Sequence, residues 1–295
     1  MLGRLREGLH SRSGLVRKGS AFALQIPKLL LSRGANHAQY CQTPPVLANS
    51  FPKSGTHLLD QIAEGLPGRC NYGEFISSMT SSFQMRERTV PNTCRVVGRS
   101  LPGELVRAHI FYHPDVEAVL EKLNFLSLFI YRDPRDVAIS AAHYLRSMNP
   151  WHRLHKYFKR CRDMEEAILL SIRGLRREDA SIPLDDIAAS WQRYAGWTKS
   201  GSTLAFRFED LVGERRDEEL RRIAQKYADL STESIDVDAV SLALRNSIAP
   251  EKSHTFRQGS TGKWREQFTP ACRDAFKEVG GDMLIELGYE SDLNW

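Results

Sequence analysis

The sequence lacks paired cysteines. Its five cysteines are odd in number, far apart and never spaced as Cys-x-x-Cys: Cys41, Cys70, Cys94, Cys161 and Cys272. A disulfide-stapled fold and a cysteine-bound zinc site both need such pairs, so the sequence argues against both. Scattered thiols are typical of a reducing compartment, which predicts a cytoplasmic protein.

A long hydrophobic run is also missing. The most apolar N-terminal stretch, SAFALQIPKLLL at residues 20–31, is interrupted by Gln25, Pro27 and Lys28. It is too short and too broken to span a bilayer, and it has no clean signal-peptide cleavage site. We expect a helix packed on the body or a mobile arm, with peripheral contact to acidic lipid as the alternative.

The sequence has no broad excess of positive charge. The net charge is +5, but residues 1–33 hold seven Lys or Arg residues against Glu7 and carry +6 by themselves. The rest of the chain is close to neutral, which argues against a nucleic-acid partner. We therefore expect a basic N-terminal arm, residues 1–45, followed by one domain, residues 46–295.

Internal repeats and linkers are absent, and short apolar segments alternate with helical patterns. Strands are predicted at residues 46–51, 94–98, 125–131 and 203–208. Helices are predicted after the first strand, from 134 to about 148, through much of 149–200, and from 269 to 288 with a break at Gly280 and Gly281. Trp191 and Trp197 are expected inside the protein. This alternation predicts a single α/β domain with a mainly parallel central sheet flanked by helices.

The most informative stretch is FPKSGTHLL, residues 51–59, where the first strand meets a helix. Such a loop presents backbone N–H groups and a helix N-terminus to an anion. Lys53 adds positive charge, Gly55 permits close backbone approach, and three neighbours can donate hydrogen bonds: Ser54, Thr56 and His57. The Walker A pattern is missing because the lysine precedes the glycine, so an ordinary nucleoside-triphosphate kinase is disfavoured. A plain strand–helix turn is the alternative.

A second segment suited to anions is YRDPRDVAIS, residues 131–140. Arg132 leaves a predicted strand, and Ser140 lies about two turns along the helix that Asp133 and Pro134 begin. A guanidinium and a hydroxyl group that converge suit one phosphate. In open α/β sheets, ligands bind beyond the carboxyl ends of the strands, which is where both segments fall. An ordinary exposed Arg-Asp cluster is the alternative.

Together these segments resemble the sulfotransferases that use 3′-phosphoadenosine 5′-phosphosulfate (PAPS). FPKSGTHLL is similar to the family's 5′-phosphosulfate loop, and FIYRDPRDVAISAAHY, residues 129–144, is similar to its 3′-phosphate segment. FRFEDL at 206–211 and FRQGSTGKWREQFT at 256–269 are similar to two later blocks. The resemblance implies the P-loop-like nucleotide-binding core of the sulfotransferase type.

The resemblance also implies a role for each matching residue. Lys53 would contact the oxygen that bridges phosphate and sulfate, and would stabilise the leaving group. The 5′-phosphate would be held by Ser54, Gly55, Thr56 and His57. The 3′-phosphate would be held by Arg132, Ser140, Arg257, Gln258 and Gly259. Phe208 replaces the family's strand-end tyrosine in the cofactor site and keeps its ring. No metal ion is implied.

A general base is needed because a hydroxyl group attacks sulfur more readily as it loses its proton. In the family's cytosolic branch, a histidine lies a little over twenty residues before the 3′-phosphate arginine. The stretch VRAH places His109 at that position before Arg132. His109 is therefore the predicted base, and His113 and Glu74 are the alternatives.

The leading hypothesis is a PAPS-dependent sulfotransferase that acts on a hydroxyl-bearing acceptor, with a glycan or a secondary metabolite favoured. One alternative is a nucleotide kinase or NTPase. Another is a non-catalytic nucleotide-binding protein that the basic arm recruits to membranes. The sequence defines no oligomeric state.

Overall fold

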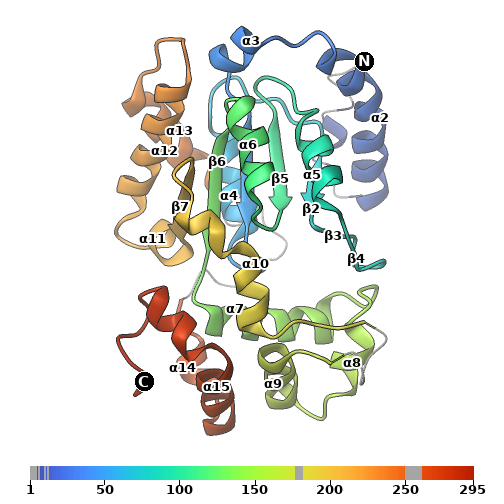
Figure 1. Cartoon of the computed structure of the whole chain (residues 1–295), viewed down its shortest axis with the longest axis vertical. Coiled ribbons are helices and arrows are strands. Elements are labelled where there is room, and N and C mark those ends of the chain that lie inside the picture. The colour runs from blue at the N-terminus through green and yellow to red at the C-terminus, as the bar shows by residue number, and fades with distance from the viewer. Residues whose placement is uncertain (1–4, 6, 10, 12, 177–181, 250–260) are drawn as a thin grey trace.

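A five-stranded parallel sheet forms the centre of the computed structural model, in the order β2-β5-β1-β6-β7 (Figure 1). Its strands are β1 Val46–Ser50, β2 Phe75–Ser77, β5 Leu105–His109, β6 Leu126–Tyr131 and β7 Thr203–Arg207. A small antiparallel pair follows β2 in the chain, β3 Met79–Thr80 with β4 Arg86–Glu87. The structure describes residues 5, 7–9, 11, 13–176, 182–249 and 261–295.

Helices flank this sheet, as the sequence predicts (Figure 1). In the first half of the chain they are α2 Gly14–Ser32, α3 His37–Gln42, α4 Thr56–Glu64, α5 Val90–Val97, α6 Pro114–Lys122, α7 Pro134–His143 and the π-helical turn η1 Tyr144–Met148. In the second half they are α8 His155–Arg160, α9 Met164–Arg173, α10 Ile187–Lys199, α11 Phe208–Val212, α12 Arg216–Leu230, α13 Val237–Ser247, α14 Trp264–Gln267 and α15 Pro270–Glu286.

The apolar runs of β1 and β6 are buried on both faces of the sheet, because successive side chains point to opposite faces. On one face Val46 and Leu128 pack in a cluster with residues of α4, α12 and α13. On the other face Phe129 packs in a cluster that contains Trp191 and Trp197, both almost fully buried as predicted. The prediction of a mainly parallel α/β fold is confirmed.

Two predicted helix signals are also found. Asp133 caps α7, since its side chain accepts a hydrogen bond from the backbone N–H of Arg135, and Pro134 is the first helical residue. The last helix, α15, has non-helical backbone angles at Gly280, close to the predicted break. The Asp133 cap and Pro134 place the start of α7 directly after the carboxyl end of β6.

The predicted strand at residues 94–98 is wrong, because residues 94–97 form the end of α5 and Gly98 is its C-cap. A short run with two valines suits a strand and a buried helical turn equally, and Pro91 in the first turn favours the helix. The sequence prediction also missed β5 and β2. In β5 the apolar residues are interrupted by Arg107 and His109, which is the alternation expected of a strand with one polar face.

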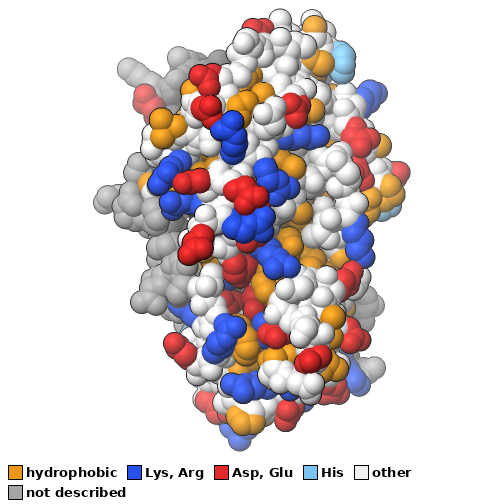
Figure 2. Space-filling view, turned by 90° about the vertical axis from the view of Figure 1, so that its left-hand side faces the viewer, with side chains coloured by type: hydrophobic (Ala, Val, Ile, Leu, Met, Phe, Trp, Pro, Cys, Tyr) orange, Lys and Arg blue, Asp and Glu red, His pale blue; other side chains and the backbone are white. Residues whose placement is uncertain are grey.

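Charged side chains of both signs are mixed on the side of the molecule where α12 and α13 lie (Figure 2). Ion pairs join these two helices there, between Arg221 and Asp238 and between Arg245 and Asp217. Mixed charges of this kind are ordinary for a solvated helical surface and contribute little stability. Among the described residues in Figure 2, positive and negative side chains are interspersed, and neither sign covers this face alone.

Candidate active site

Between β1 and α4 the chain makes a tight turn. Lys53 has a φ of 70° and Gly55 a φ of 101°, both in the left-handed region. Glycine enters this region without steric cost and lysine does not, so the turn holds Lys53 in a strained backbone conformation. The first N–H groups of α4 lack acceptors within the helix, and the helix dipole favours an anion at this end. The backbone of the turn is therefore suited to an anion.

Ser54 supplies an independent sign that a ligand binds at this turn. Its side chain is fully buried, and its Oγ atom has no hydrogen-bond partner among the described residues. A buried hydroxyl group left unpaired costs about 1–3 kcal/mol. A phosphate oxygen at the turn would satisfy it, so the residues present fit the phosphate that the sequence predicts here.

Phe208, the first residue of α11, contacts both predicted anion-binding segments. A Cβ atom at Gly55 would come within 2.5 Å of Cδ2 of the Phe208 ring, so only glycine fits at this position. The Cζ atom of Arg132 lies 4.7 Å from the centroid of the same ring, a distance typical of a cation–π contact. The turn at residues 51–55 and the segment 131–140 are therefore neighbours in space.

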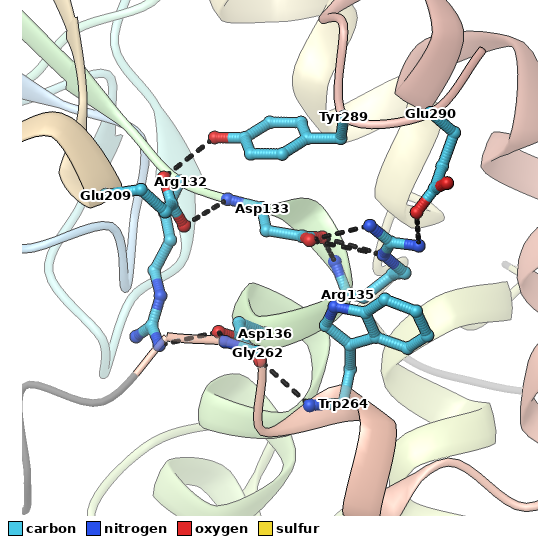
Figure 3. A network of polar contacts seen from close by, with 9 residues as sticks. All are labelled: Arg132, Asp133, Arg135, Asp136, Glu209, Gly262, Trp264, Tyr289 and Glu290. Atoms are coloured by element: carbon cyan, nitrogen blue, oxygen red, sulfur yellow. Dashed lines mark hydrogen bonds and ion pairs between the residues drawn. The ribbon is translucent and has the colours of Figure 1, made fainter. Parts of the chain in front are cut away.

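Asp136 holds the second segment together (Figure 3). Its Oδ2 atom accepts hydrogen bonds from Nη2 of Arg132 at 2.8 Å and from the backbone N–H of Gly262 at 2.9 Å. Its Oδ1 atom accepts one from the backbone N–H of Trp264 at 3.0 Å. Asp136 thus orients the Arg132 guanidinium and ties the segment that contains Gly262 to the start of α7. The predicted ligands Arg257, Gln258 and Gly259 lie outside the described residues.

A second network of polar contacts stabilises the start of α7 (Figure 3). Arg135 is buried, forms ion pairs with Asp133 and Glu290, and has its Cζ atom 3.6 Å from the centroid of the Trp264 ring. The backbone N–H of Asp133 donates to Glu209 at 3.1 Å. These charge-assisted bonds fix the backbone that carries the predicted phosphate ligands.

We expect Asp136→Asn to weaken binding of adenosine 3′,5′-bisphosphate (PAP) by roughly tenfold, because hydrogen bonds to a charged group contribute about 1.5–3 kcal/mol. Isothermal titration calorimetry measures the affinity, and a thermal melt checks that the variant is folded. Asp282→Asn, which changes an exposed carboxylate on α15, is the matched control. Unchanged or tighter PAP binding would mean that Asp136 competes with the phosphate instead of orienting Arg132.

His109, the last residue of β5, is held by Ser50 at the end of β1. Its Nδ1 atom lies 2.9 Å from the backbone oxygen of Ser50 and 3.0 Å from Oγ of the same residue. A carbonyl oxygen only accepts, so Nδ1 carries the proton and Nε2 of the neutral ring is left as a base. Oγ of Ser50 also lies 2.8 Å from Oγ1 of Thr56, which links His109 to the first anion-binding turn.

The surroundings of His109 keep its imidazole neutral. The pKa of His109 is lowered to about 4, mainly by burial and also by the nearby charges of Lys53 and His57, while the hydrogen bond to Ser50 opposes the shift. Phe75 packs edge-on against the ring, with centroids 5.0 Å apart. At neutral pH the ring is therefore unprotonated and able to accept a proton.

One large pocket, with a volume of about 1150 Å³, brings most of the predicted site residues together. The predicted residues that line it are Lys53, Gly55, Thr56, His57, His109, Arg132, Ser140 and Phe208. Ser54 lies buried within the turn. The two anion-binding segments and the predicted base thus border a single cavity.

The two alternative bases lie elsewhere. His113 borders a separate pocket of about 200 Å³, and its Nδ1 atom caps α6 by accepting a hydrogen bond from the backbone N–H of Asp115. Glu74 does not line the large pocket and forms an ion pair with Lys28 of α2. Of the three predicted candidates, only His109 faces the cavity that contains Lys53.

Among the residues that the sequence analysis missed, three contact predicted site residues. Ser50 fixes the tautomer of His109, and Asp136 orients Arg132. The Nζ atom of Lys53 lies 4.0 Å from the centroid of the Tyr144 ring. Only Asp136 carries a local signal, because it is an acidic residue in the first turn of α7 and stands four residues after Arg132, a spacing at which an ion pair can form. The other two contacts depend on the tertiary structure.

Asp60 is a buried carboxyl group on α4 that lines the same pocket. Its Oδ1 atom has no hydrogen-bond partner in the described part of the chain. Burial raises the pKa of Asp60 to about 7, although the charge of Arg107 opposes this shift. Because the folded-state pKa lies above the ordinary value, stability is lost as the pH rises from about 4 through 7.

We therefore expect Asp60→Asn to stabilise the ligand-free protein at pH 8, by roughly 1–3 kcal/mol, since one pKa unit corresponds to about 1.4 kcal/mol. The amide is close in shape to the protonated carboxyl group, so the effect should be smaller at pH 5, where only part of this stability has been lost. Urea denaturation at both pH values measures the difference. Equal destabilisation at both would show that Asp60 is charged and satisfied.

A parallel sheet with an anion-binding turn after its central strand, and a second cationic segment beside that turn, defines an α/β protein of the nucleotide-binding class. The sulfotransferase domain family matches residues 43–288. The chain therefore belongs to the sulfotransferase family. The prediction of the family, and of a PAPS-dependent sulfotransferase as the enzyme class, is confirmed.

Solved structures are similar in fold. A mouse sulfotransferase complexed with PAP shares 16% sequence identity at a TM-score of 0.56, over 88% of this chain and 91% of that chain. A retinol dehydratase in complex with androsterone and inactive cofactor PAP shares 15% identity at a TM-score of 0.53, over 87% of this chain and 85% of that chain. No match was found among curated proteins.

Proposed function

We propose that this enzyme transfers the sulfuryl group of PAPS to a hydroxyl group of its acceptor. One observation carries the proposal: Phe208 contacts Gly55 in the first anion-binding segment and Arg132 in the second, so both segments border one pocket. Two separate cationic segments suit a nucleotide with phosphate groups on both sides of its ribose. A linear triphosphate would need only one such segment.

The first segment would hold the 5′-phosphosulfate end of the donor. Ser54 has an unpaired buried Oγ atom, the backbone at Gly55 can approach a phosphate closely, and Thr56 and His57 begin α4. The second segment would hold the 3′-phosphate through Arg132 and Ser140. Both residues line the pocket.

The chemistry then follows from the cations and the neutral imidazole. The acceptor oxygen attacks sulfur, the bond from sulfur to the 5′-phosphate oxygen breaks, and PAP leaves with the bonding electron pair. Lys53 stabilises the negative charge that grows on the bridging oxygen. Nε2 of His109 takes the proton of the acceptor hydroxyl group. Positioning and charge stabilisation supply most of the rate enhancement, as in phosphoryl transfer.

The proposed acceptor is a glycan or a secondary metabolite. The pocket wall also contains Met79, Met85 and Met148 together with His152. Methionine side chains adapt to irregular apolar surfaces, and the imidazole can form a hydrogen bond. Such a wall suits a molecule that has both an apolar skeleton and hydroxyl groups.

Calorimetry with PAP and with ATP tests the donor half of the proposal, and we expect PAP to bind at least tenfold more tightly. The acceptor half is tested by incubating the enzyme with PAPS labelled in its sulfate group and fractions of a host extract, followed by tracing of the label. Tighter binding of ATP, or no enzyme-dependent labelling of any fraction in spite of PAP binding, would overturn the proposal.

The low pKa of His109 makes a prediction about pH. A base must be unprotonated to act, so kcat/KM should be constant from about pH 6 to pH 8 and should fall only as the pH approaches 4. Initial rates across this range measure the profile, and tryptophan fluorescence checks that the protein stays folded. An acid limb near 6.5, the ordinary histidine value, would contradict a buried neutral imidazole.

A further inference from the structure

Helix α2 packs on the body through a side that contains a buried lysine as well as an apolar residue. Nζ of Lys28 is buried, lies 2.6 Å from Oε1 of the fully buried Glu104, and also pairs with Glu74. Leu24, one turn earlier, is fully buried in a small cluster that includes Tyr72. Removing one partner of a buried ion pair is strongly destabilising. These contacts therefore fix the rotation of α2 about its own axis.

The outward side of α2 is apolar. Leu15, Phe22, Ile26 and Leu30, which we call the outer stripe, have exposed fractions of 85%, 77%, 67% and 61%. Their spacing of seven, four and four residues places them on one face of the helix. A surface helix of a globular protein normally has the reverse arrangement. The outer stripe is a contiguous exposed apolar surface of the kind that marks an interaction site.

Charge indicates the kind of partner. Residues 1–33 contain seven Lys or Arg residues and one acidic residue, Glu7. The charge of Lys28 is already neutralised by carboxylates of the body, which leaves an excess of five positive charges. A second copy of the chain docked on the outer stripe would bring together two segments that each have an excess of positive charge, and these segments would repel each other. An anionic lipid surface instead attracts each basic residue near it by about 1 kcal/mol.

We propose that α2 is an interfacial helix that binds reversibly to anionic lipid membranes through its outer stripe, helped by the excess of basic residues in the segment 1–33. The apolar side chains enter the boundary between headgroups and acyl chains while the helix lies parallel to the surface. No helix in the described ranges is both long enough and apolar enough to cross a bilayer. Binding of this kind brings the sulfotransferase domain to the membrane surface.

Vesicle flotation tests the proposal with the full-length protein. Vesicles of phosphatidylcholine with 30% phosphatidylserine are compared with pure phosphatidylcholine at about 0.1 M and 0.5 M salt. We expect at least tenfold tighter partitioning to the anionic vesicles at low salt, and weaker partitioning at high salt, because salt screens the attraction. Equal partitioning to both kinds of vesicle, or no partitioning at all, would overturn the proposal.

Variants separate the apolar and the charged contributions. Phe22→Ser, Ile26→Ser and Leu30→Ser combined should lower partitioning at least tenfold, and so should Arg17→Glu with Lys18→Glu. The matched control is Leu242→Ser, which removes a leucine with an exposed fraction of 58% from α13 and should change nothing. Thermal melts and PAP affinity check that each variant keeps its fold and its pocket.

Light scattering after size exclusion distinguishes a second copy from a membrane. We expect a mass that does not depend on the outer stripe. A dimer that the triple variant dissociates, without vesicle binding by the wild type, would assign the outer stripe to self-association and overturn the membrane proposal. Neither result affects the donor site, because PAP binding and sulfuryl transfer are measured separately and in the absence of lipid.

Discussion

Lys53→Ala is expected to lower sulfuryl transfer on the order of a thousandfold while PAP still binds within a few-fold of wild type. The bridging oxygen gains negative charge as the bond to sulfur breaks, and a cation fixed at that position stabilises the transition state more than the ground state. Lys53 suits this role because it lies in the strained turn just before the N-terminus of α4. Its Nζ atom lies 4.0 Å from the centroid of the Tyr144 ring. Single-turnover transfer rates and PAP calorimetry measure the two effects.

Lys263→Ala is the matched control for Lys53→Ala. Lys263 also lines the pocket, but no role at the bond to be broken is predicted for it. Its loss should weaken nucleotide binding without a comparable loss in the single-turnover rate. A folded Lys53→Ala protein that turns over at the wild-type rate would remove Lys53 from the mechanism. A loss confined to PAP affinity would make it a binding residue only.

The parts of the site that could be predicted are contiguous in sequence. The turn at residues 51–55 has a lysine and a glycine, and the segment 131–140 has an arginine, a capping aspartate and a proline, so both can be recognised without knowledge of the fold. Long-range contacts leave no such signal. Asp136 acts on Gly262 and Trp264, more than a hundred residues away, and the outward face of α2 depends on the pairing of Lys28 with Glu104.

The strand predictions likewise succeeded where the local sequence carries a clear signal and failed where it does not. β1 and β6 are almost entirely buried and β7 is partly buried, and all three contain short apolar stretches and were predicted within one residue at each end. The edge-side strands β5 and β2 were missed because Arg107 and His109 interrupt the apolar pattern of β5 and β2 has only three residues. The residue that breaks the pattern, His109, is the one that the proposed chemistry needs, as expected where function overrides local sequence preference.

The tautomer of His109 could not be predicted from any side-chain pattern. The atom that fixes it is the backbone oxygen of Ser50, and every residue type offers the same oxygen. Its position follows from the parallel pairing of β1 with β5, in which Asn49 lies opposite Ala108. The sequence predicts the base, and only the assembled sheet determines which nitrogen atom is free.

His109→Ala is expected to lower kcat by about a hundredfold or more, as loss of a general base implies, with little change in PAP affinity. His113→Ala is the matched control and should act at nearly the wild-type rate, since it borders another pocket. Initial rates from pH 4 to 9 also separate a base from a structural residue, because the acid limb near pH 4 should vanish in the variant.

Rescue of the His109→Ala variant by added imidazole is a second test of His109 as the general base. Replacing the ring by a methyl group leaves a cavity beside Ser50, and free imidazole that enters it can accept the proton in place of the side chain. We expect partial rescue that increases with the concentration of neutral imidazole. A near-normal rate for His109→Ala without imidazole would transfer the role to another group. A variant that is slow, cannot be rescued and is less stable would make His109 a structural residue of the β1–β5 pair.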